Sequence, residues 1–166
     1  MTYRVRAARA TDIPAVHALR GPWVERGVLL GREKVEMYEQ VQEMLVAVDA
    51  NDRVVGCGAL HVMWQDLAEV RSVVIDTNLQ GQGIGHIILD ALVARAEALG
   101  IKRIFCLTFE TDFFGRHGFE PIADAPVDEA TFSEMIRSSD EGIAEFLDLA
   151  RVKQNTLGNT RMLRLL

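Results

Sequence analysis

The sequence predicts a protein of mixed α/β (α+β) class, in which an antiparallel meander leads into one parallel strand–helix–strand crossover. Two observations carry this prediction. Short apolar, strand-like runs follow one another through the first half of the chain, with polar turns between them. A glycine-rich turn then joins one such run to an amphipathic helix and a further strand. We expect the chemistry where the crossover strand meets its helix.

The first half of the chain contains two helical stretches and four strands. Thr11-Asp12 ahead of Pro14 indicates a helix start, and that helix is expected to end near Gly21-Pro22. The second helical stretch is rich in Glu, Lys, Gln and Met, and polar residues separate the two strands that follow it. The expected strands are residues 2–7, 44–48, 53–62 and 67–75, and the second helical stretch is residues 32–44.

The clearest helix is expected over residues 83–99, where apolar residues recur at i, i+3 and i+4 spacing and Gly100 provides a stop. Beyond it we expect a strand at 102–108, a short helix at 112–117, a mostly helical segment at 123–155 and a last strand at 160–166. A length of 166 residues suits one domain. We therefore predict a single domain over residues 1–166, with a helical insert at about 123–155.

The composition and charge of the chain argue against several classes of partner. The net charge of −6 provides no general attraction for nucleic acid or an anionic membrane, so neither is expected as a partner. No stretch approaches the ~20 uncharged apolar residues of a membrane span, and no zinc-type spacing or other metal motif is present. Cys57 and Cys106 lie in strand-like runs and are expected to be buried free thiols. We expect a cytoplasmic protein without a metal.

The most informative motif is Gln80-Gly81-Gln82-Gly83-Ile84-Gly85, which stands between an apolar strand and a helix. Glycines let the backbone turn tightly, and the N–H groups of the first helical turn then form an anion site that suits a phosphate or pyrophosphate. The spacing excludes a P-loop and does not match a dinucleotide fingerprint. The alternative is a turn that only packs the helix on the strand.

In this setting, Gln80-x-x-Gly83-x-Gly85 resembles the pyrophosphate loop of the GCN5-related N-acetyltransferases, the GNAT superfamily. The opening residues 5–12 and the Phe114–Phe119 segment are similar to two other parts of that family. The resemblance covers about residues 3–122 and the final strand. It implies the GNAT fold, a mixed and mostly antiparallel central sheet with helices on both faces. It also implies acetyl-CoA as cosubstrate and an amine as acceptor.

Three segments carry a narrower resemblance to N-acetylglutamate synthases, and above all to the short, single-domain synthases of actinobacterial type. They are residues 27–33, 107–119 and 158–163. This resemblance implies direct acetyl transfer, in a ternary complex, to the α-amine of L-glutamate or L-glutamine, the first step of arginine biosynthesis. It also implies a small amino-acid substrate, and it is compatible with a homodimer.

The family resemblance assigns cofactor roles to three parts of the chain. Backbone N–H groups before the loop bind pantetheine and the acetyl oxygen, where one oxyanion donor contributes ~3 kcal/mol. The loop binds the pyrophosphate, and two aromatic rings wall the pantetheine. The residues implied are Val73, Val74, Ile75, Gln80, Gly81, Gln82, Gly83, Ile84, Gly85, His86, Phe113, Phe114 and Arg116.

Glu69 is the candidate general base, because it lies on the strand before the loop, where the histone-acetyltransferase branch carries its catalytic Glu. A solvated or salt-bridged strand glutamate is the alternative. Many family members have a Tyr acid where this chain has Phe114, so protonation of the leaving thiolate by water is expected. His117 is an alternative acid, although a helix-end histidine more often has a structural role.

An amino-acid substrate carries carboxylates, which suit arginine or lysine side chains. The candidates are Arg32, Lys34, Arg71 and Arg161, of which Arg32 and Arg161 match basic positions of the synthases. Each alone is also consistent with a surface charge. Glu110 stands where the synthases have Arg, which would repel a side-chain carboxylate and favour the amide of glutamine.

Two other functions remain open at this point. One is acetylation of another amine, such as a polyamine, an antibiotic or a protein N-terminus. Seven acidic residues between Asp124 and Glu145 suit a polycation, although we interpret them as a solvated helical face. The other is a catalytically silent sensor that binds acetyl-CoA, which the missing Tyr favours and Glu69 disfavours.

Overall fold

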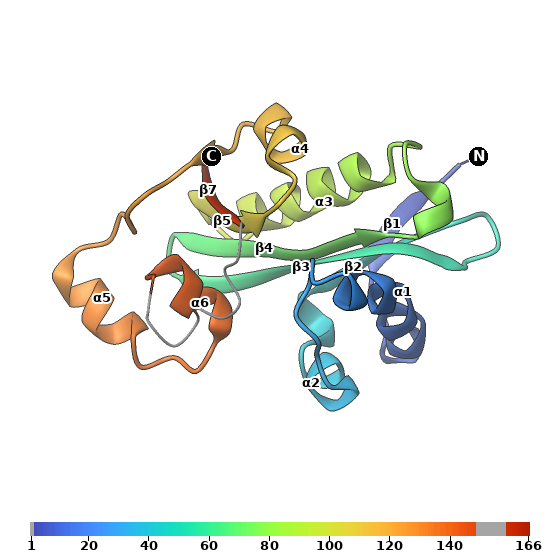
Figure 1. Cartoon of the computed structure of the whole chain (residues 1–166), viewed down its shortest axis with the longest axis horizontal. Helices are drawn as coiled ribbons and strands as arrows, with labels where there is room; N and C mark the ends of the chain where they lie inside the picture. Colours follow the sequence, from blue (N-terminus) through green and yellow to red (C-terminus); the bar gives the residue numbers. More distant parts are fainter. Residues whose placement is uncertain (1, 149–158) are drawn as a thin grey trace. The chain divides into compact units, whose positions relative to one another are not determined.

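A computed structural model describes residues 2–148 and 159–166 (Figure 1). The strands are β1 (Arg4–Ala7), β2 (Met44–Val48), β3 (Val54–Trp64), β4 (Leu67–Ile75), β5 (Arg103–Thr108), β6 (Glu120–Pro121) and β7 (Thr160–Leu165). The helices are α1 (Ile13–Glu25), α2 (Lys34–Glu39), α3 (Ile84–Ala98), α4 (Thr111–Arg116), α5 (Glu129–Met135) and α6 (Glu141–Phe146). Among these residues, no helix has the length and apolarity to cross a membrane.

The strands hydrogen-bond in the order β1-β2-β3-β4-β5-β7-β6. The pairs β1–β2, β2–β3, β5–β7 and β6–β7 are antiparallel, whereas β4 and β5 are parallel and are joined through α3. This confirms the predicted α/β class, the mostly antiparallel sheet and the single crossover. The two-residue β6 has no signal in the sequence, because a pair of residues is too short to show alternation.

The chain divides into two compact units. The first comprises Met1–His61 and Val70–Ala98, and the second comprises Val62–Glu69 and Leu99–Leu166. Strands β3 and β4 contribute residues to both units. The single domain over residues 1–166 stays a prediction.

In the first unit, β3 sends alternate residues to opposite faces. Gly56 and Gly58 face α3, where a Cβ on Gly58 would lie 2.8 Å from Ile88 Cγ2. Cys57 and Ala59 belong to the opposite core, which includes Ile13 and Val16 of α1 and Met37 of α2. Figure 1 shows α3 on one side of these strands and α1 and α2 on the other. The two glycines therefore bring α3, which begins at the glycine loop, close to the sheet.

Helix α1 does not end near Gly21-Pro22, as predicted, but continues to Glu25. Pro22 removes one helix hydrogen bond, because it has no N–H group. The next residue compensates, since Trp23 packs against the core and donates its indole N–H to Ile75 O at 3.3 Å. The stretch 32–44 is also less helical than predicted: α2 covers six residues, and a strand begins at Met44.

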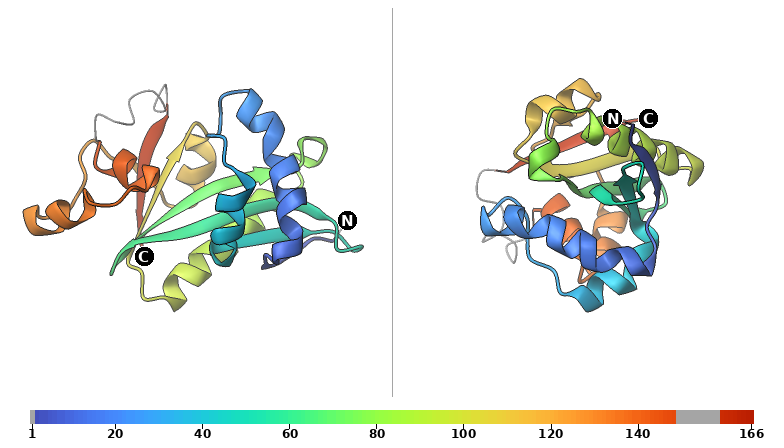
Figure 2. Two further views of the ribbon diagram at one scale, coloured as in Figure 1. Left: turned by 90° about the horizontal axis from the view of Figure 1, so that it is seen from below. Right: turned by 90° about the vertical axis from the view of Figure 1, so that its right-hand side faces the viewer.

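The second unit is built on the antiparallel pair β5–β7, which Figure 2 shows side by side. Phe105 of β5 meets Phe146 of α6 edge-on, with ring centroids 5.2 Å apart. The expected helical insert is two short helices over its described part, because Asp128 and Asp140 each begin a new helix by accepting a hydrogen bond from a backbone N–H. Residues 149–155 of the insert and Gly158 of the closing motif lie outside the described residues.

Both cysteines are free and buried, as predicted. Cys57 lies in β3 and Cys106 in β5. Burial raises the pKa of the Cys57 thiol to about 12. Burial also raises the pKa of Cys106, and the nearby Glu69 charge adds to that effect.

The close approach of α3 to β3 gives a stability prediction. Gly58→Val places methyl groups against Ile88 and Leu92, so we expect unfolding to cost about 1–3 kcal/mol less. The matched control is Gly115→Ala in α4, where nothing lies within 4 Å of the added Cβ. Urea unfolding followed by circular dichroism measures both. Equal midpoints for the two variants would contradict this account of the packing.

Candidate active site

Strand β4 is interrupted at Ser72, whose φ of 57° lies in the left-handed region. A non-glycine residue in this region is strained, and in a strand it breaks the alternation of side chains. The carbonyl of Ser72 accepts a hydrogen bond from Cys57 Sγ at 3.5 Å. This distortion of the strand lies directly before Val73, Val74 and Ile75. Of these three residues, only Val74 is buried.

The glycine loop connects β4 to α3. The carboxylate of Asp76 accepts a hydrogen bond from the N–H of Asn78 at 2.9 Å and so fixes the turn that precedes the loop. Gly81 and Gly83 have φ values of 79° and 81°, which L side chains rarely adopt. Nothing lies within 4 Å of a Cβ built at either glycine. The loop therefore requires glycine for its backbone path, and its outer side is open.

Helix α3 begins directly after this loop. Its first residue, Ile84, is buried, as is Gly85, whereas His86 is exposed. The side-chain oxygen of Gln82 accepts a hydrogen bond from the hydroxyl of Tyr3 at 2.6 Å, which ties the loop to the N-terminal segment. Because α3 is 15 residues long, its N-terminal N–H groups and its dipole favour an anion at this end.

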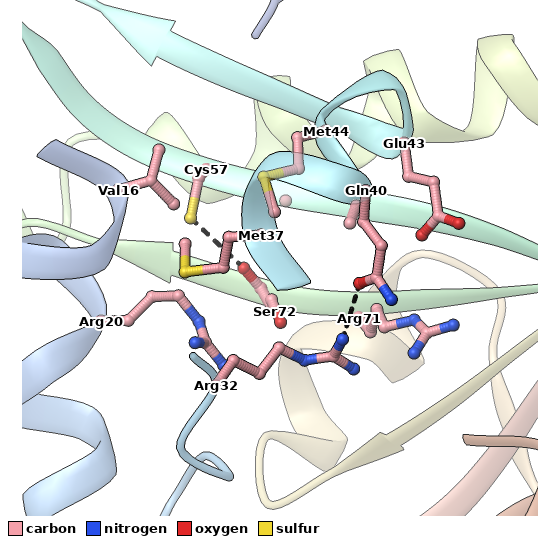
Figure 3. A pocket seen from close by; sticks show the side chains of 12 residues that line it. Val16, Arg20, Arg32, Met37, Gln40, Glu43, Met44, Cys57, Arg71 and Ser72 are labelled. Atoms are coloured by element: carbon pink, nitrogen blue, oxygen red, sulfur yellow. Dashed lines mark hydrogen bonds between the residues drawn. The ribbon is translucent and has the colours of Figure 1, made fainter. Parts of the chain in front are cut away.

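A pocket lies in the first unit (Figure 3). Three arginines from three different segments line it: Arg20 of α1, Arg32 ahead of α2 and Arg71 of β4. In Figure 3 they form a row below the apolar side chains of Val16, Met37 and Met44. The remaining lining residues are Val16, Met37, Gln40, Glu43, Met44, Cys57, Gly58, Ala59 and Ser72. A pocket of this kind suits a small anion with an apolar part.

Arg20 is the arginine that sequence reasoning missed. It is 4% exposed and donates from Nη2 to Leu30 O at 2.9 Å, but its Nε finds no hydrogen-bond partner among the described residues. Burial lowers the pKa of its guanidinium. A signal was present, because Arg20 continues the buried stripe formed by Ile13 and Val16 on α1. A charged residue on an apolar helix face deserves a functional interpretation.

The structure brings together two of the four predicted basic residues. Arg32 and Arg71 both line the pocket, where Arg32 Nη1 donates to Gln40 Oε1 at 2.7 Å. Lys34 is exposed at the start of α2 and does not line the pocket. Arg161 belongs to the second unit, where its guanidinium donates to the carbonyls of Phe146 and Ala123.

Glu69 is buried in the second unit, with 5% of its surface exposed. Its carboxylate lies against the backbone of α6, because a Cβ on Gly142 would lie 2.7 Å from Glu69 Oε1. Glu145 of the same helix is also buried. Our interpretation of residues 124–145 as a solvated acidic face is therefore wrong for Glu145. Its signal in the sequence is local, because apolar residues flank Glu145 on both sides, Ile143-Ala144 before it and Phe146-Leu147 after it.

The predicted site residues in and next to α4 differ from one another in exposure and in their contacts. Phe114 is buried and packs edge-on against Phe119 at 5.2 Å between centroids. Phe113 is partly exposed, and its ring lies 5.2 Å from that of His117. Arg116 is exposed and donates from Nε to Asp112 O at 3.3 Å. Glu110 is also exposed, and its backbone N–H donates to Thr108 Oγ1 at 2.8 Å.

Comparison with known proteins extends this description. The acetyltransferase (GNAT) family profile matches residues 15–119. An amino-acid acetyltransferase of Mycobacterium tuberculosis is 51% identical over 164 residues, which are 98% of this chain and 94% of the relative. An amino-acid acetyltransferase of Pasteurella multocida is 30% identical over 126 residues, which are 74% of this chain and 28% of that longer protein.

Two crystal structures are similar in fold. Rv2747 of Mycobacterium tuberculosis, in complex with CoA and NLQ, has a TM-score of 0.92 and 50% identity, covering 98% of this chain and 99% of that one. The N-acetylglutamate synthase of Neisseria gonorrhoeae, complexed with coenzyme A and N-acetyl-glutamate, has a TM-score of 0.80 and 23% identity, covering 100% of this chain and 35% of that one. The second likeness concerns the fold alone. Because the family profile spans the segment that holds the broken strand and the glycine loop, this chain belongs to the acetyltransferase (GNAT) family.

Proposed function

We propose that this chain is an acetyl-CoA-dependent amino-acid N-acetyltransferase of arginine biosynthesis, with the α-amine of L-glutamate or L-glutamine as acceptor. The observation that carries the proposal is the pocket lined by Arg20, Arg32 and Arg71. Three guanidinium groups beside apolar side chains suit a small molecule that bears carboxylates. The name of the 51% identical relative, amino-acid acetyltransferase, supports the same function.

The chain has the features that acetyl-CoA binding requires. The pyrophosphate fits the loop Gln80–Gly85, because Gly81 and Gly83 leave the approach to the backbone open and α3 begins directly behind them. This fit requires no cationic side chain, although His86 lies exposed on the first turn of α3. We assign the pantetheine wall to the partly exposed Phe113 rather than to Phe114, which is buried within the second unit.

Acetyl-CoA supplies the acetyl group as a thioester and leaves as the thiol. The chain's part is to align the two substrates and to polarise the thioester carbonyl. We assign the polarising N–H groups to Val73–Ile75, because the left-handed Ser72 changes the direction of the strand directly before them. A backbone donor aimed at the developing oxyanion contributes about 3 kcal/mol.

The acceptor's α-ammonium group must lose a proton before its nitrogen can attack a carbonyl. Glu69 is the proposed base, and it shares strand β4 with Arg71, two residues along the chain. The leaving thiolate takes its proton from water, because the position of the family's Tyr acid is held by Phe114.

We also propose that the protein works in the cytoplasm. Its two free thiols, Cys57 and Cys106, form no disulfide, which suits a reducing compartment. This function requires two small molecules, the amino-acid acceptor and acetyl-CoA.

The first experiment measures thiol release from acetyl-CoA with glutamate, glutamine, polyamines and peptide N-termini side by side. We expect turnover with glutamate or glutamine alone, because only these acceptors carry a free carboxylate on the same carbon as the reacting amine, where the arginine pocket can bind it. Turnover only with polyamines or peptides would overturn the amino-acid assignment. Tight acetyl-CoA binding without turnover of any amine would instead identify a sensor.

The arginine pocket gives a second prediction. Arg71→Gln removes one guanidinium, so we expect KM for the amino acid to rise and kcat/KM to fall about 10–100-fold, the range for a hydrogen bond to a charged group. Lys34→Gln is the matched control, because Lys34 is exposed and lies outside the pocket. Steady-state kinetics measures both variants, and circular dichroism checks their folding. A similar loss in the two variants would contradict the pocket assignment.

Glu110 gives a third prediction, about the choice between the two acceptors. If its charge repels the side-chain carboxylate of glutamate, Glu110→Gln raises kcat/KM for glutamate several-fold and leaves that for glutamine nearly unchanged. An exposed charge contributes up to about 1 kcal/mol, which sets this scale. The measurement is the ratio of the two kcat/KM values. Glu120→Gln, another exposed site in the second unit, is the control. An unchanged ratio in Glu110→Gln removes Glu110 from the acceptor site.

A further inference from the structure

The second unit buries two carboxyl side chains near one another, Glu69 of β4 and Glu145 of α6, which are 5% and 4% exposed. The Glu69 carboxylate lies against α6 at Gly142, where a Cβ would come within 2.7 Å of its Oε1. Gly142 and Glu145 are three residues apart and therefore lie on the same side of the helix. Helix α6 thus brings a second buried carboxyl toward Glu69.

Glu145 lacks the contacts that would stabilise a buried negative charge. Neither of its carboxylate oxygens has a hydrogen-bond partner among the described residues. An ionised carboxylate without partners is costly to bury, and two adjacent carboxylates disfavour double ionisation. The pair therefore favours a state that carries one proton and one negative charge.

The groups around the pair are mostly acidic. Among the described residues, those that act on one of the two carboxyls include Cys106 of β5, Arg161 of β7, Glu141 of α6 and Asp148 after α6. Arg161 is the one cation among them, and it is shared with two backbone carbonyls and with Asp148 at 4.0 Å. Burial first, and the Glu69 charge second, raise the pKa of Glu145 to about 7.

We propose that Glu145 is a positioning residue for the reaction: it holds the shared proton, so that Glu69 remains the one ionised carboxylate of the pair. This inference rests on the proposed function, because it assumes that Glu69 is the base. Glu145 acts through Glu69 and does not touch the substrates. Above neutral pH Glu145 loses its proton, and the second negative charge then makes Glu69 more basic.

The proton transfers balance as follows. The acceptor's ammonium group gives one proton to the Glu69 carboxylate, and the neutral amine forms a C–N bond with the acetyl carbon. The C–S bond breaks, and the departing thiolate takes up a proton while the nitrogen loses its second proton. Glu69 then releases its proton to water, and Glu145 ends the cycle in the state in which it began.

The kinetic test uses kcat at saturating amino acid and acetyl-CoA between pH 5.5 and pH 8.5 in the full chain. We expect two steps in the wild-type profile, of which the upper lies near pH 7. Glu145→Gln keeps a neutral group of the same size, so it retains kcat at pH 6 within about twofold and loses the upper step. Glu69→Gln lowers kcat about 100-fold or more at every pH. Glu134→Gln, an exposed change on α5, keeps the wild-type profile.

Two kinetic results would overturn the proposal. One is a Glu145→Gln profile that coincides with the wild-type profile, because the upper step would then belong to another group. The other is an equal loss of kcat at every pH, which indicates a merely structural role for Glu145.

Thermal unfolding tests the carboxyl pair without any activity. The folded pKa of Glu145 is raised from 4.5 to about 7, so between these values the folded chain holds a proton that the unfolded chain lacks. This contribution to stability is complete below pH 4.5 and is lost as the pH rises through about 7. The Glu145→Gln variant has no carboxyl group at this position to ionise. The Tm of the variant minus the Tm of the wild type should therefore increase by ~5 °C between pH 5 and pH 8. A constant Tm difference over this range would overturn the proposal.

The unfolding data also separate this inference from the proposed function. In Glu69→Gln the negative charge near Glu145 is absent, which lowers the folded pKa of Glu145. The pH window over which protonated Glu145 loses its contribution to stability should therefore move to lower pH. An unmoved window means that the two carboxyls are independent, and the pairing then fails. If no amino acid is acetylated while the window moves as expected, the proposed function fails and the carboxyl pair stands.

Discussion

The left-handed backbone at Ser72 is the constraint on which the proposed chemistry depends. Strand β4 pairs with β5 through Leu67–Glu69, and Ser72 lies three residues further on. One short strand thus contains the proposed base, an arginine of the pocket and the proposed oxyanion donors. A regular strand would keep its backbone N–H groups within a ladder. The break costs of order 1–3 kcal/mol of strain, and the core around Cys57 and Val74 holds it in place.

Much of the fold could be predicted from the sequence, because its strongest patterns are local. Strand β4 has the predicted bounds. Helix α3 begins and ends within one residue of its own predicted bounds, since the glycine loop and Gly100 mark its ends. Errors arose where tertiary contacts outweigh local preference. The partly buried Trp23 carries α1 past Pro22, and the capping residues Asp128 and Asp140 divide what composition indicates as one helical segment.

The candidate site was predicted less completely, for a physical reason. The glycine loop is a contiguous motif, whereas the arginine pocket gathers residues from α1, α2 and β4. Arg20 and Glu145 were missed because burial, not residue type, separates them from surface charges. In both cases a single charged residue interrupts an apolar face, and a pattern search treats such a residue as noise. Buried charges are costly, so these exceptions mark the positions that function explains best.

The burial of both cysteines has a consequence for an enzyme whose product is a thiol. Coenzyme A readily forms disulfides, and these exchange with protein thiolates. With a pKa of about 12, on the order of one in 10⁵ molecules carries Cys57 as a thiolate at neutral pH. Cys57 lines the arginine pocket, yet it is 2% exposed. Burial and a raised pKa therefore make both cysteines poor partners for disulfide exchange with coenzyme A, the enzyme's own product.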